Sequence, residues 1–419
     1  MRNWLLFLYH RLKEQLWAKP VAICVLAVAG VFVAKAADQL AFALAAPDVT
    51  LESVETLLKV IAASMLVMAI FAVGSMVSAY ASASNNATPR AFPLVIADDV
   101  SQNALTAFIG AFIFSIVALF ALQNGYYGQA GRFTLLLLTF VVFAVVILTF
   151  VWWVDRIARL GRLGTAIEKV ESATAAALKR RRRTPRLGGS TVGSRDGHAL
   201  AIFCESIGYV QHVKVPALQA LAEELDVRIE VAALPGTFAS PARPLAYVTG
   251  DALDPSDIGP QISCAFVIGG NRTFEDDPRF GLVVLSEIAS RALSPGINDS
   301  GTAIGVIGSL VRLLVLWSQP IDNDESVELE FDRVAIPELS LGDMFDDAFT
   351  VISRDGAGAV EVALRLQKAF EALASVANTE TREVSLHYAR MAVARAEKAL
   401  ELEEDRKAVR KAGRFALID

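Results

Sequence analysis

The stretch VIAASMLVMAIFAVGSMVSAYA, from Val60 to Ala81, carries no charged side chain and decides the fold. The hydrocarbon core of a bilayer is roughly 30 Å thick, so about 20 apolar residues in one α-helix cross it. Because water is excluded there, the backbone must form its own hydrogen bonds, which favours a helix. Three similar stretches precede residue 156, and we expect none after it: Val21–Ala46, Ala104–Leu122 and Phe133–Val154. The sequence therefore predicts four transmembrane helices.

Basic residues precede the first predicted span and follow the fourth. Lys and Arg near span ends are retained in the cytoplasm, so both chain termini are predicted to be cytoplasmic. Apolar and basic residues before Val21 predict an N-terminal helix that lies on the membrane surface, although a secretory signal ending near Ala34-Lys35-Ala36 is an alternative. Within the first span, Lys35 is predicted to extend to the lipid headgroups or to pair with Asp38, which is one turn further on.

The second predicted span has a polar stripe along one side. Steps of four and three residues place its members on one face of a helix. Two explanations remain open, namely close helix packing through small and hydroxyl side chains, and a pore around a symmetry axis. The stripe consists of Ser64, Met68, Phe71, Ser75, Ser78, Ser82 and Asn85. In the third span, Asn103, Thr106 and Gly110 repeat the spacing, which predicts a polar path at the cytoplasmic mouth of both helices.

The remainder of the chain has the texture of a mixed α/β cytoplasmic domain. We predict a transmembrane domain over residues 1–155, a basic juxtamembrane helix and linker over 156–189, a β-rich module over 190–260 and a mainly helical region over 261–419. A run of four arginines in the juxtamembrane helix is predicted to face anionic lipid, and the alternatives are a topology signal or a solvated linker. The run is Arg180, Arg181, Arg182 and Arg183.

Polar residues gather around tight turns between Asn271 and Thr302. A turn that offers Asn and Asp near two arginines is a candidate ligand site or subunit contact. Helix capping by Asp299 or Ser300 and pairing of Glu287 with Arg291 are ordinary structural alternatives. The candidates are Arg272, Asp277, Glu287, Arg291, Asn298 and Asp299.

Composition and motifs exclude several classes of function. A formal net charge of −6 argues against a nucleic-acid binder. Cys24, Cys204 and Cys264 are isolated, so neither a metal site nor a cofactor is expected. The sequence contains no Walker loop, no GxSxG and no HExxH, which makes a non-enzymatic function the better prediction.

Several motifs resemble one known family across nearly the whole chain. They are the break Thr88-Pro89-Arg90, Gly208-Tyr209-Val210-Gln211, Pro235-Gly236-Thr237-Phe238, Arg272-Thr273, Asp277-Pro278-Arg279-Phe280-Gly281 and Arg291-Ala292-Leu293-Ser294-Pro295-Gly296-Ile297-Asn298-Asp299. Together with four N-terminal spans, they resemble the bacterial predicted membrane proteins grouped as domain of unknown function 2254. Ser300, where the family usually has proline, and Asp276, where it has glutamine, depart from the pattern. The resemblance implies a bacterial inner membrane but no established activity.

Two functional hypotheses follow from these features. The first is a homo-oligomeric ion channel or channel-like transport protein in which the second span is nearest the axis and the cytoplasmic domain is regulatory. The second is a membrane-anchored sensor or scaffold whose cytoplasmic domain binds a small molecule or a protein partner. The lipid bilayer, further copies of the chain and anionic lipid are the expected partners, and the soluble ligand is left open.

Overall fold

The computed structural model describes residues 18–39, 47, 49–86, 88–96, 99–157, 163–193, 199–250, 254–320, 329–376 and 378–417. The predicted interfacial helix before Val21 lies almost entirely outside the described residues. The chain divides into two compact units, Met1–Ala166 and Ile167–Asp419. The first unit is a helical bundle and the second is a mixed α/β region, so the predicted fold class is confirmed.

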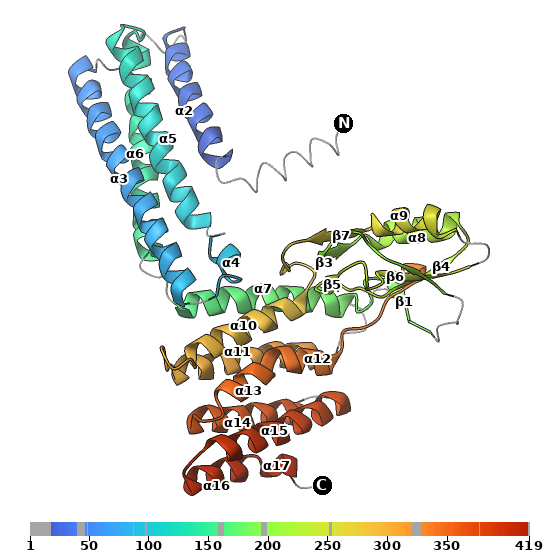
Figure 1. The fold of residues 1–419 in the computed structure, drawn as a ribbon. Coiled ribbons are helices and arrows are strands. Elements are labelled where there is room, and N and C mark those ends of the chain that lie inside the picture. Colours follow the sequence, from blue (N-terminus) through green and yellow to red (C-terminus); the bar gives the residue numbers. More distant parts are fainter. Residues whose placement is uncertain are drawn as a thin grey trace. The chain divides into compact units, whose positions relative to one another are not determined.

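The first unit consists of helices that run alongside one another (Figure 1). The central helix is α5 (Asp99–Gln123), which packs against α2 (Ala18–Ala36), α3 (Leu51–Asn86) and α6 (Gln129–Ile157). The short helices η1 (Ala37–Gln39) and α4 (Phe92–Ile96) follow α2 and α3. Trp153 of α6 is fully buried and meets Phe108 of α5 edge to face, with ring centroids 5.9 Å apart. Aromatic packing therefore joins two of the spans at one end of the bundle.

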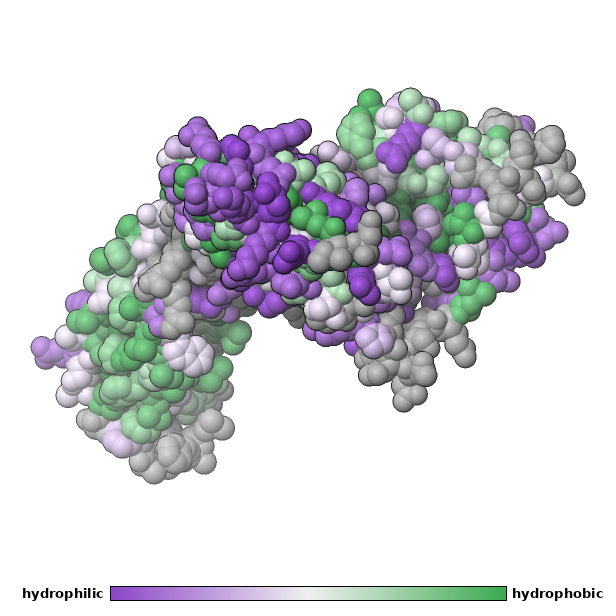
Figure 2. Space-filling view, turned by 90° about the horizontal axis from the view of Figure 1, so that it is seen from below, coloured by the Kyte–Doolittle hydropathy of each residue, from purple (hydrophilic) through white to green (hydrophobic). Residues whose placement is uncertain are grey.

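The outside of the first unit is apolar. Large hydrophobic side chains remain exposed on every one of its long helices, including Leu26, Ile70, Phe120 and Leu148. Hydrophobic colour covers much of this unit in Figure 2. Apolar surface on this scale is unfavourable in water and fits hydrocarbon, so these helices belong in a lipid bilayer.

Length and hydropathy mark α3, α5 and α6 as candidate spans, over Leu51–Ser78, Gln102–Gln123 and Gln129–Arg156. The described part of the first predicted span is a shorter apolar helix, Val21–Ala36. A further candidate is Ser300–Ser318 in the second unit, so the expectation that no such helix follows residue 155 is wrong. That helix, α11, packs against α10 and α14 and buries one face, so much of its hydropathy contributes to a protein core.

Asp38 joins two spans of the first unit. Its carboxylate accepts hydrogen bonds from the backbone N–H groups of Gly128, at 2.8 Å, and Gly131, at 2.6 Å, at the start of α6. The N-terminal N–H groups of a helix need such acceptors, and a negative charge suits the helix dipole. Lys35 Nζ lies 3.4 Å from the same carboxylate, which confirms the predicted pair.

The β-strands of the second unit form two sheets. The larger has the order β1 (Gly189–Ser190), β8 (Phe331–Ala335), β4 (Arg228–Val231), β6 (Ala246–Thr249) and β2 (Leu200–Ile202). The smaller has the order β5 (Phe238–Ala239), β3 (Gly208–Val213) and β7 (Phe266–Gly269). Strand β8 pairs in parallel with β1 and β4. The larger sheet therefore takes a strand from the region predicted to be mainly helical.

Helices make up most of the rest of the second unit. Helix α8 (Val215–Glu224) packs against β8, and α9 (Pro255–Ser263) against β2. The longer helices α7 (Leu163–Arg183), α10 (Pro278–Ala292), α11 (Ser300–Ser318), α14 (Val360–Val376) and α15 (Thr379–Ala399) supply most of the helical core. Short segments α12 (Leu341–Phe345), the π-helix η4 (Asp346–Thr350) and α13 (Val351–Asp355) precede α14, whereas α16 (Glu403–Ala412) and α17 (Arg414–Leu417) follow α15. Pairwise contacts of α10 with α11, α11 with α14 and α14 with α15 make a stack of helices (Figure 1).

A close contact and an ion pair hold helix α7 to this stack. A Cβ atom added to Gly281 of α10 would lie 1.8 Å from the hydroxyl of Thr174, so the two helices require glycine there. Arg312 of α11 forms two hydrogen bonds with Glu171 of α7, at 2.6 and 2.7 Å, which holds the pKa of Glu171 below its usual value. Helix α7 is thereby fixed to α10 and α11.

We expect Gly281→Ala to lower the free energy of unfolding by about 1–3 kcal/mol, because the new methyl group forces α7 and α10 apart. The matched control is Gly305→Ala in α11, where a Cβ atom meets nothing within 4 Å. Since alanine favours a helix, the control is expected to be neutral or to gain about 0.5–1 kcal/mol. Thermal unfolding of both variants in detergent measures the difference, and equal midpoints would contradict the close contact.

Candidate functional site at an arginine-rich pocket

The most enclosed charged pair of the second unit lies in the turn between β7 and α10. Arg272 donates from Nε and Nη2 to the two carboxylate oxygens of Asp277, at 2.6 and 3.0 Å. The Asp277 side chain is 2% exposed and that of Arg272 is 19% exposed. Asp277 also accepts the backbone N–H of Phe280 and caps α10. The structure therefore brings together two of the predicted ligand-site residues, and it gives Asp277 a structural task as well.

The turn Pro235-Gly236-Thr237-Phe238 lies directly against this pair. Gly236 has a φ of +92°, which favours glycine, and a Cβ atom there would lie 2.3 Å from an oxygen of Asp277. The N–H of Gly236 donates to Val210 of β3 at 2.8 Å. Two segments that are about 40 residues apart, both quoted for the family resemblance, thus meet at one place.

Arg279, in the first turn of α10, extends the cluster of charges. Its Nε donates to Asp347 at 2.6 Å, and its Nη1 contacts Asp343 of α12. Asp347 belongs to the π-helix η4, a rare wide turn that often marks functional sites. Burial raises the pKa of Asp347, and the nearby Arg279 opposes that shift. The guanidinium of Arg279 is therefore held in place by two carboxylates.

A pocket of about 320 Å³ opens beside these groups. It lies between the turn 235–238 on one side and α10, α12 and the segment before α12 on the other. Three arginines line it, namely Arg243, Arg272 and Arg279, and the acidic residues on its wall are Glu338 and Asp343. Ligand pockets commonly have volumes of about 300 Å³ or more and a few convergent polar groups, so this is the candidate functional site.

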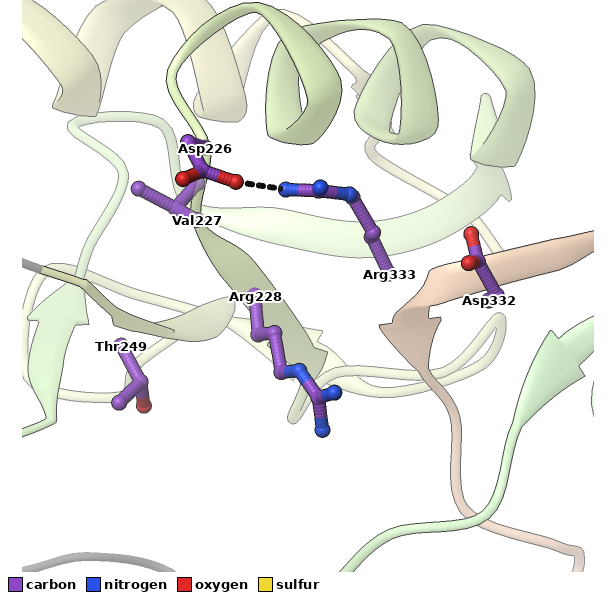
Figure 3. Close-up of a pocket in the computed structure, with 6 residues that line it drawn as sticks. All are labelled: Asp226, Val227, Arg228, Thr249, Asp332 and Arg333. Carbon is purple, nitrogen blue, oxygen red and sulfur yellow. Dashed lines mark hydrogen bonds and ion pairs between the residues drawn. The ribbon is translucent and has the colours of Figure 1, made fainter.

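A second pocket, of about 390 Å³, lies at the ends of β4 and β8 (Figure 3). Arg333 Nη1 donates to Asp226 at 2.6 Å, and Asp332 accepts from Gln219 at 2.8 Å. In Figure 3, Asp226 and Arg333 face each other, whereas the guanidinium of Arg228 points away from that pair. Because Asp226 is 88% exposed, this pocket is a shallow surface feature with balanced charge.

The run of arginines at the end of α7 contacts loops of the second unit. Arg180 donates to the carbonyl of Glu275, and Arg182 donates to that of Gln319 at 2.7 Å. Arg181 is 3% exposed, and burial lowers its pKa to about 10, although the charges of Asp276 and Asp277 oppose this. The prediction of a lipid-facing side chain is therefore wrong for Arg181, because a buried group cannot reach headgroups. For Arg180, Arg182 and Arg183 it stays a prediction.

The other predicted ligand residues lie elsewhere on α10 and beyond it. Glu287 and Arg291 are half-buried in the second half of the helix, and Asn298 and Asp299 follow its end. A helix of 15 residues is about 22 Å long, so the predicted cluster is divided between its two ends. Asp299 accepts the N–H and hydroxyl of Thr302, at 3.0 and 2.6 Å, which confirms the predicted cap of α11 and lowers the pKa of Asp299.

The polar stripe of the second span lies on a flank of α3. The buried face of α3 includes Ile61, Met65, Ala69 and Ala72, and the stripe lies roughly 100° around the helix from it. Ser64, Phe71 and Ser78 are exposed within the single chain, and Met68 and Ser75 are half-buried. The side chains of Ser82 and Asn85 lie outside the described set.

The predicted polar path on the third span is wrong for two of its three residues. Thr106 is buried and donates to the carbonyl of Gln102 at 2.7 Å. A Cβ atom on Gly110 would lie 2.2 Å from Ile23 of α2. These two residues serve helix packing, whereas Asn103 is exposed.

Sequence reasoning missed Arg243 and Arg279 as functional candidates. Arg279 stands inside the motif Asp277-Pro278-Arg279-Phe280-Gly281, so the signal was present in the residues quoted for the resemblance. Arg243 follows the turn 235–238 and has no such signal, since its place in the pocket depends on tertiary structure. Within the described ranges, no group of three His, Cys, Asp or Glu residues suits a metal ion.

The bundle of apolar helices joined to a mixed α/β unit defines a multi-pass membrane protein. The match to the family described as "Predicted membrane protein (DUF2254)" covers residues 13–372, and the chain belongs to that family. It is 32% identical over 139 residues to the uncharacterized protein Rv1290c of Mycobacterium tuberculosis and, equally, to the uncharacterized protein Mb1321c of Mycobacterium bovis. Each match spans 32% of this chain and 27% of the relative's length. No solved structure matches the chain.

Replacing Asp277 by Asn should lower the free energy of unfolding by about 3 kcal/mol, because the isosteric amide leaves the Arg272 guanidinium without its carboxylate. Asparagine still caps helices, so loss of the cap does not explain the effect. The matched control is Asp226→Asn at the exposed pair with Arg333, where little change is expected. Thermal unfolding of the two variants checks this. Similar midpoints would show that the Arg272–Asp277 pair stabilises the protein no more than the exposed Arg333–Asp226 pair does.

Alanine at position 299 is expected to cost about 1 kcal/mol, because α11 loses its cap. Asn298→Gly is the control, since a φ of +52° at Asn298 suits glycine. Denaturation of both variants measures the effect. A stable Asp299→Ala protein would remove the capping explanation and restore Asp299 as a ligand candidate.

Proposed function

We propose that this protein is a homo-oligomeric ion channel or channel-like transport protein in a bacterial inner membrane. In this proposal α3 is nearest the symmetry axis, both termini are cytoplasmic and the second unit is a cytoplasmic regulatory domain. Serines with few fixed charges suit a weakly selective or gated conduit.

The observation that carries the proposal is that three serine hydroxyl groups on α3 lack hydrogen-bond partners in the described part of the chain. Those of Ser64, Ser75 and Ser78 make no hydrogen bond to any described residue. On α5 and α6, by contrast, each of the buried hydroxyl groups of Thr106, Ser115 and Thr139 donates to the carbonyl four residues earlier, at 2.7, 2.8 and 2.7 Å. Hydroxyl groups that face hydrocarbon without a partner are unfavourable. Water or a second copy of α3 would satisfy the serine stripe.

A cavity among the described helices of one bundle has a different character from the serine stripe. This cavity, of about 600 Å³, lies between α2, α5 and α6 and is lined entirely by apolar residues and glycine. A water-filled conduit needs polar groups along it. The proposed path therefore lies between copies of the chain, along the serine stripe of α3.

The test is current through a planar bilayer that contains the purified full-length protein, with Ser75→Trp as the blocking variant. If Ser75 faces the conduit, an indole fills it, and we expect discrete currents in the wild type to fall by at least about tenfold, which is the effect of a barrier of about 1.4 kcal/mol.

Val77→Trp is the matched control. It stands two residues along, about 200° around α3 from Ser75, at nearly the same depth, and its side chain is exposed. Currents that persist in Val77→Trp and vanish in Ser75→Trp support the pore. A silent wild-type protein of correct assembly, or equal currents in both variants, would contradict it.

A second candidate function is a membrane-anchored sensor or scaffold, in which the second unit binds a ligand and the helices serve as an anchor. The pocket beside Arg272 and Asp277 favours it, because the charged groups there are already held in position. The two proposals are compatible, because binding of a ligand in this pocket is one way to regulate a channel.

A further inference from the structure

The arginine-rich pocket contains guanidinium groups that have donors to spare. A guanidinium has five N–H donors. Arg272 uses two of its donors on Asp277, and Arg279 uses two on Asp347 and Asp343. The carboxylates fix the position of each planar group and leave its other N–H donors available to a ligand. Preorganised donors of this kind reduce the entropy that binding costs.

The guanidinium of Arg243 has no partner among the described residues, either by hydrogen bond or by ion pair. The acidic groups on the pocket wall do not compensate it. Glu338 is paired with Arg186 at 2.6 Å, and Asp343 is paired with Arg279. The guanidinium of Arg243 therefore has no carboxylate of its own among the described residues, and it lies in the same pocket as the spare donors of Arg272 and Arg279.

Two hydroxyl groups add further donors to the pocket. The hydroxyl of Thr237 makes no hydrogen bond to the described part of the chain. The oxygen of Ser340 accepts the N–H of Asp343 at 3.2 Å, so its own proton remains free to be donated. Both residues line the pocket together with the three arginines. These two hydroxyl groups add to the free N–H donors of the three arginines.

The remaining wall is apolar and includes Leu234, Phe238, Pro337 and Leu339. Phe238 is 48% exposed and contacts Tyr209 edge to face. A volume of about 320 Å³ admits a small molecule with a compact organic part. An oxyanion that accepts several hydrogen bonds, attached to such a part, matches both the donors and the apolar wall.

We infer that this pocket binds the phosphate group of a small ligand, with Arg243, Arg272 and Arg279 as its cationic partners. The planar guanidinium matches phosphate oxygens in geometry and charge. The ligand is either a soluble phosphate ester or the headgroup of a lipid. This inference rests on the ligand-binding role of the second unit and is independent of the proposed pore.

Thermal unfolding of the purified full-length protein tests the inference. The midpoint is measured against inorganic phosphate and glycerol 3-phosphate, with acetate at the same ionic strength as the reference. A ligand that binds the native state raises the midpoint in a saturable way. We expect both phosphate compounds, and not acetate, to do so. A third titration with short-chain phosphatidic acid, against phosphatidylcholine, identifies a lipid source if it alone raises the midpoint.

Arg243→Gln is the diagnostic variant, because an exposed side chain without a partner contributes little to folding. We expect its Kd for phosphate to rise roughly tenfold, as for the loss of one charged hydrogen-bond partner. The matched control is Arg228→Gln, at an exposed arginine of the second pocket whose guanidinium also has no partner in the described ranges. An unchanged Kd is expected there.

Two results would overturn the inference. One is a midpoint that responds to none of the phosphate compounds, phosphatidic acid included, more than to the reference. The other is equal weakening in Arg243→Gln and Arg228→Gln, which would indicate non-specific attraction of anions. Either result leaves bilayer currents, and thus the proposed pore, untouched, and a silent bilayer leaves phosphate binding untouched.

Discussion

The second unit depends on the enclosed carboxylate of Asp277. This one group receives Arg272, caps the helix that follows, contacts the turn at Gly236 and attracts the buried Arg181. A buried charge is tolerated only where donors surround it. The strands, α7 and α10 must all be in place before that requirement is met, so the carboxylate couples the folding of sheet and helices. Because Arg272 donates to this carboxylate, the same requirement holds its guanidinium in place beside the pocket.

The first unit is organised by a different constraint, the absence of water. Its helices satisfy their own backbone, and the exposed N-terminal N–H groups of α6 obtain acceptors from Asp38 of the segment after α2. Each unit thus has a carboxylate that connects separate elements. Asp38 caps α6, a helix from another part of the chain, whereas Asp277 caps α10, the helix that it precedes. The serines of the α3 stripe differ from the buried hydroxyl groups of Thr106, Ser115 and Thr139, because those groups donate within their own helices and the serines make no such bond within the described ranges.

Sequence patterns predicted what is local or compositional. Hydropathy and helix length identified the apolar helices, the spacing of Asp299 ahead of α11 predicted its cap, and the one-turn spacing of Lys35 and Asp38 predicted their pair. Contacts between distant segments were beyond the sequence. The pairing of β8 with β4 joins residues about 100 apart, and the burial of Arg181 depends on loops that approach α7 only in the folded chain. Arg243 became a candidate for the same reason. The family motifs named the turn 235–238 and Asp277 separately, but nothing in their spacing placed them together.

The hydropathy of α11 has a consequence for the way this protein is made. Ser300–Ser318 is apolar enough to resemble a span, yet it belongs to a packed core, so the insertion machinery must pass it over during synthesis. Arg312, in the C-terminal half of the helix, adds to the free-energy cost of inserting it, by up to the roughly 2.5–3.5 kcal/mol that an arginine costs at the centre of a span. The same guanidinium later pairs with Glu171 of α7, which is synthesised earlier and is available when α11 emerges. One arginine therefore opposes insertion of the nascent helix into the membrane and then helps to fix the folded helix against α7.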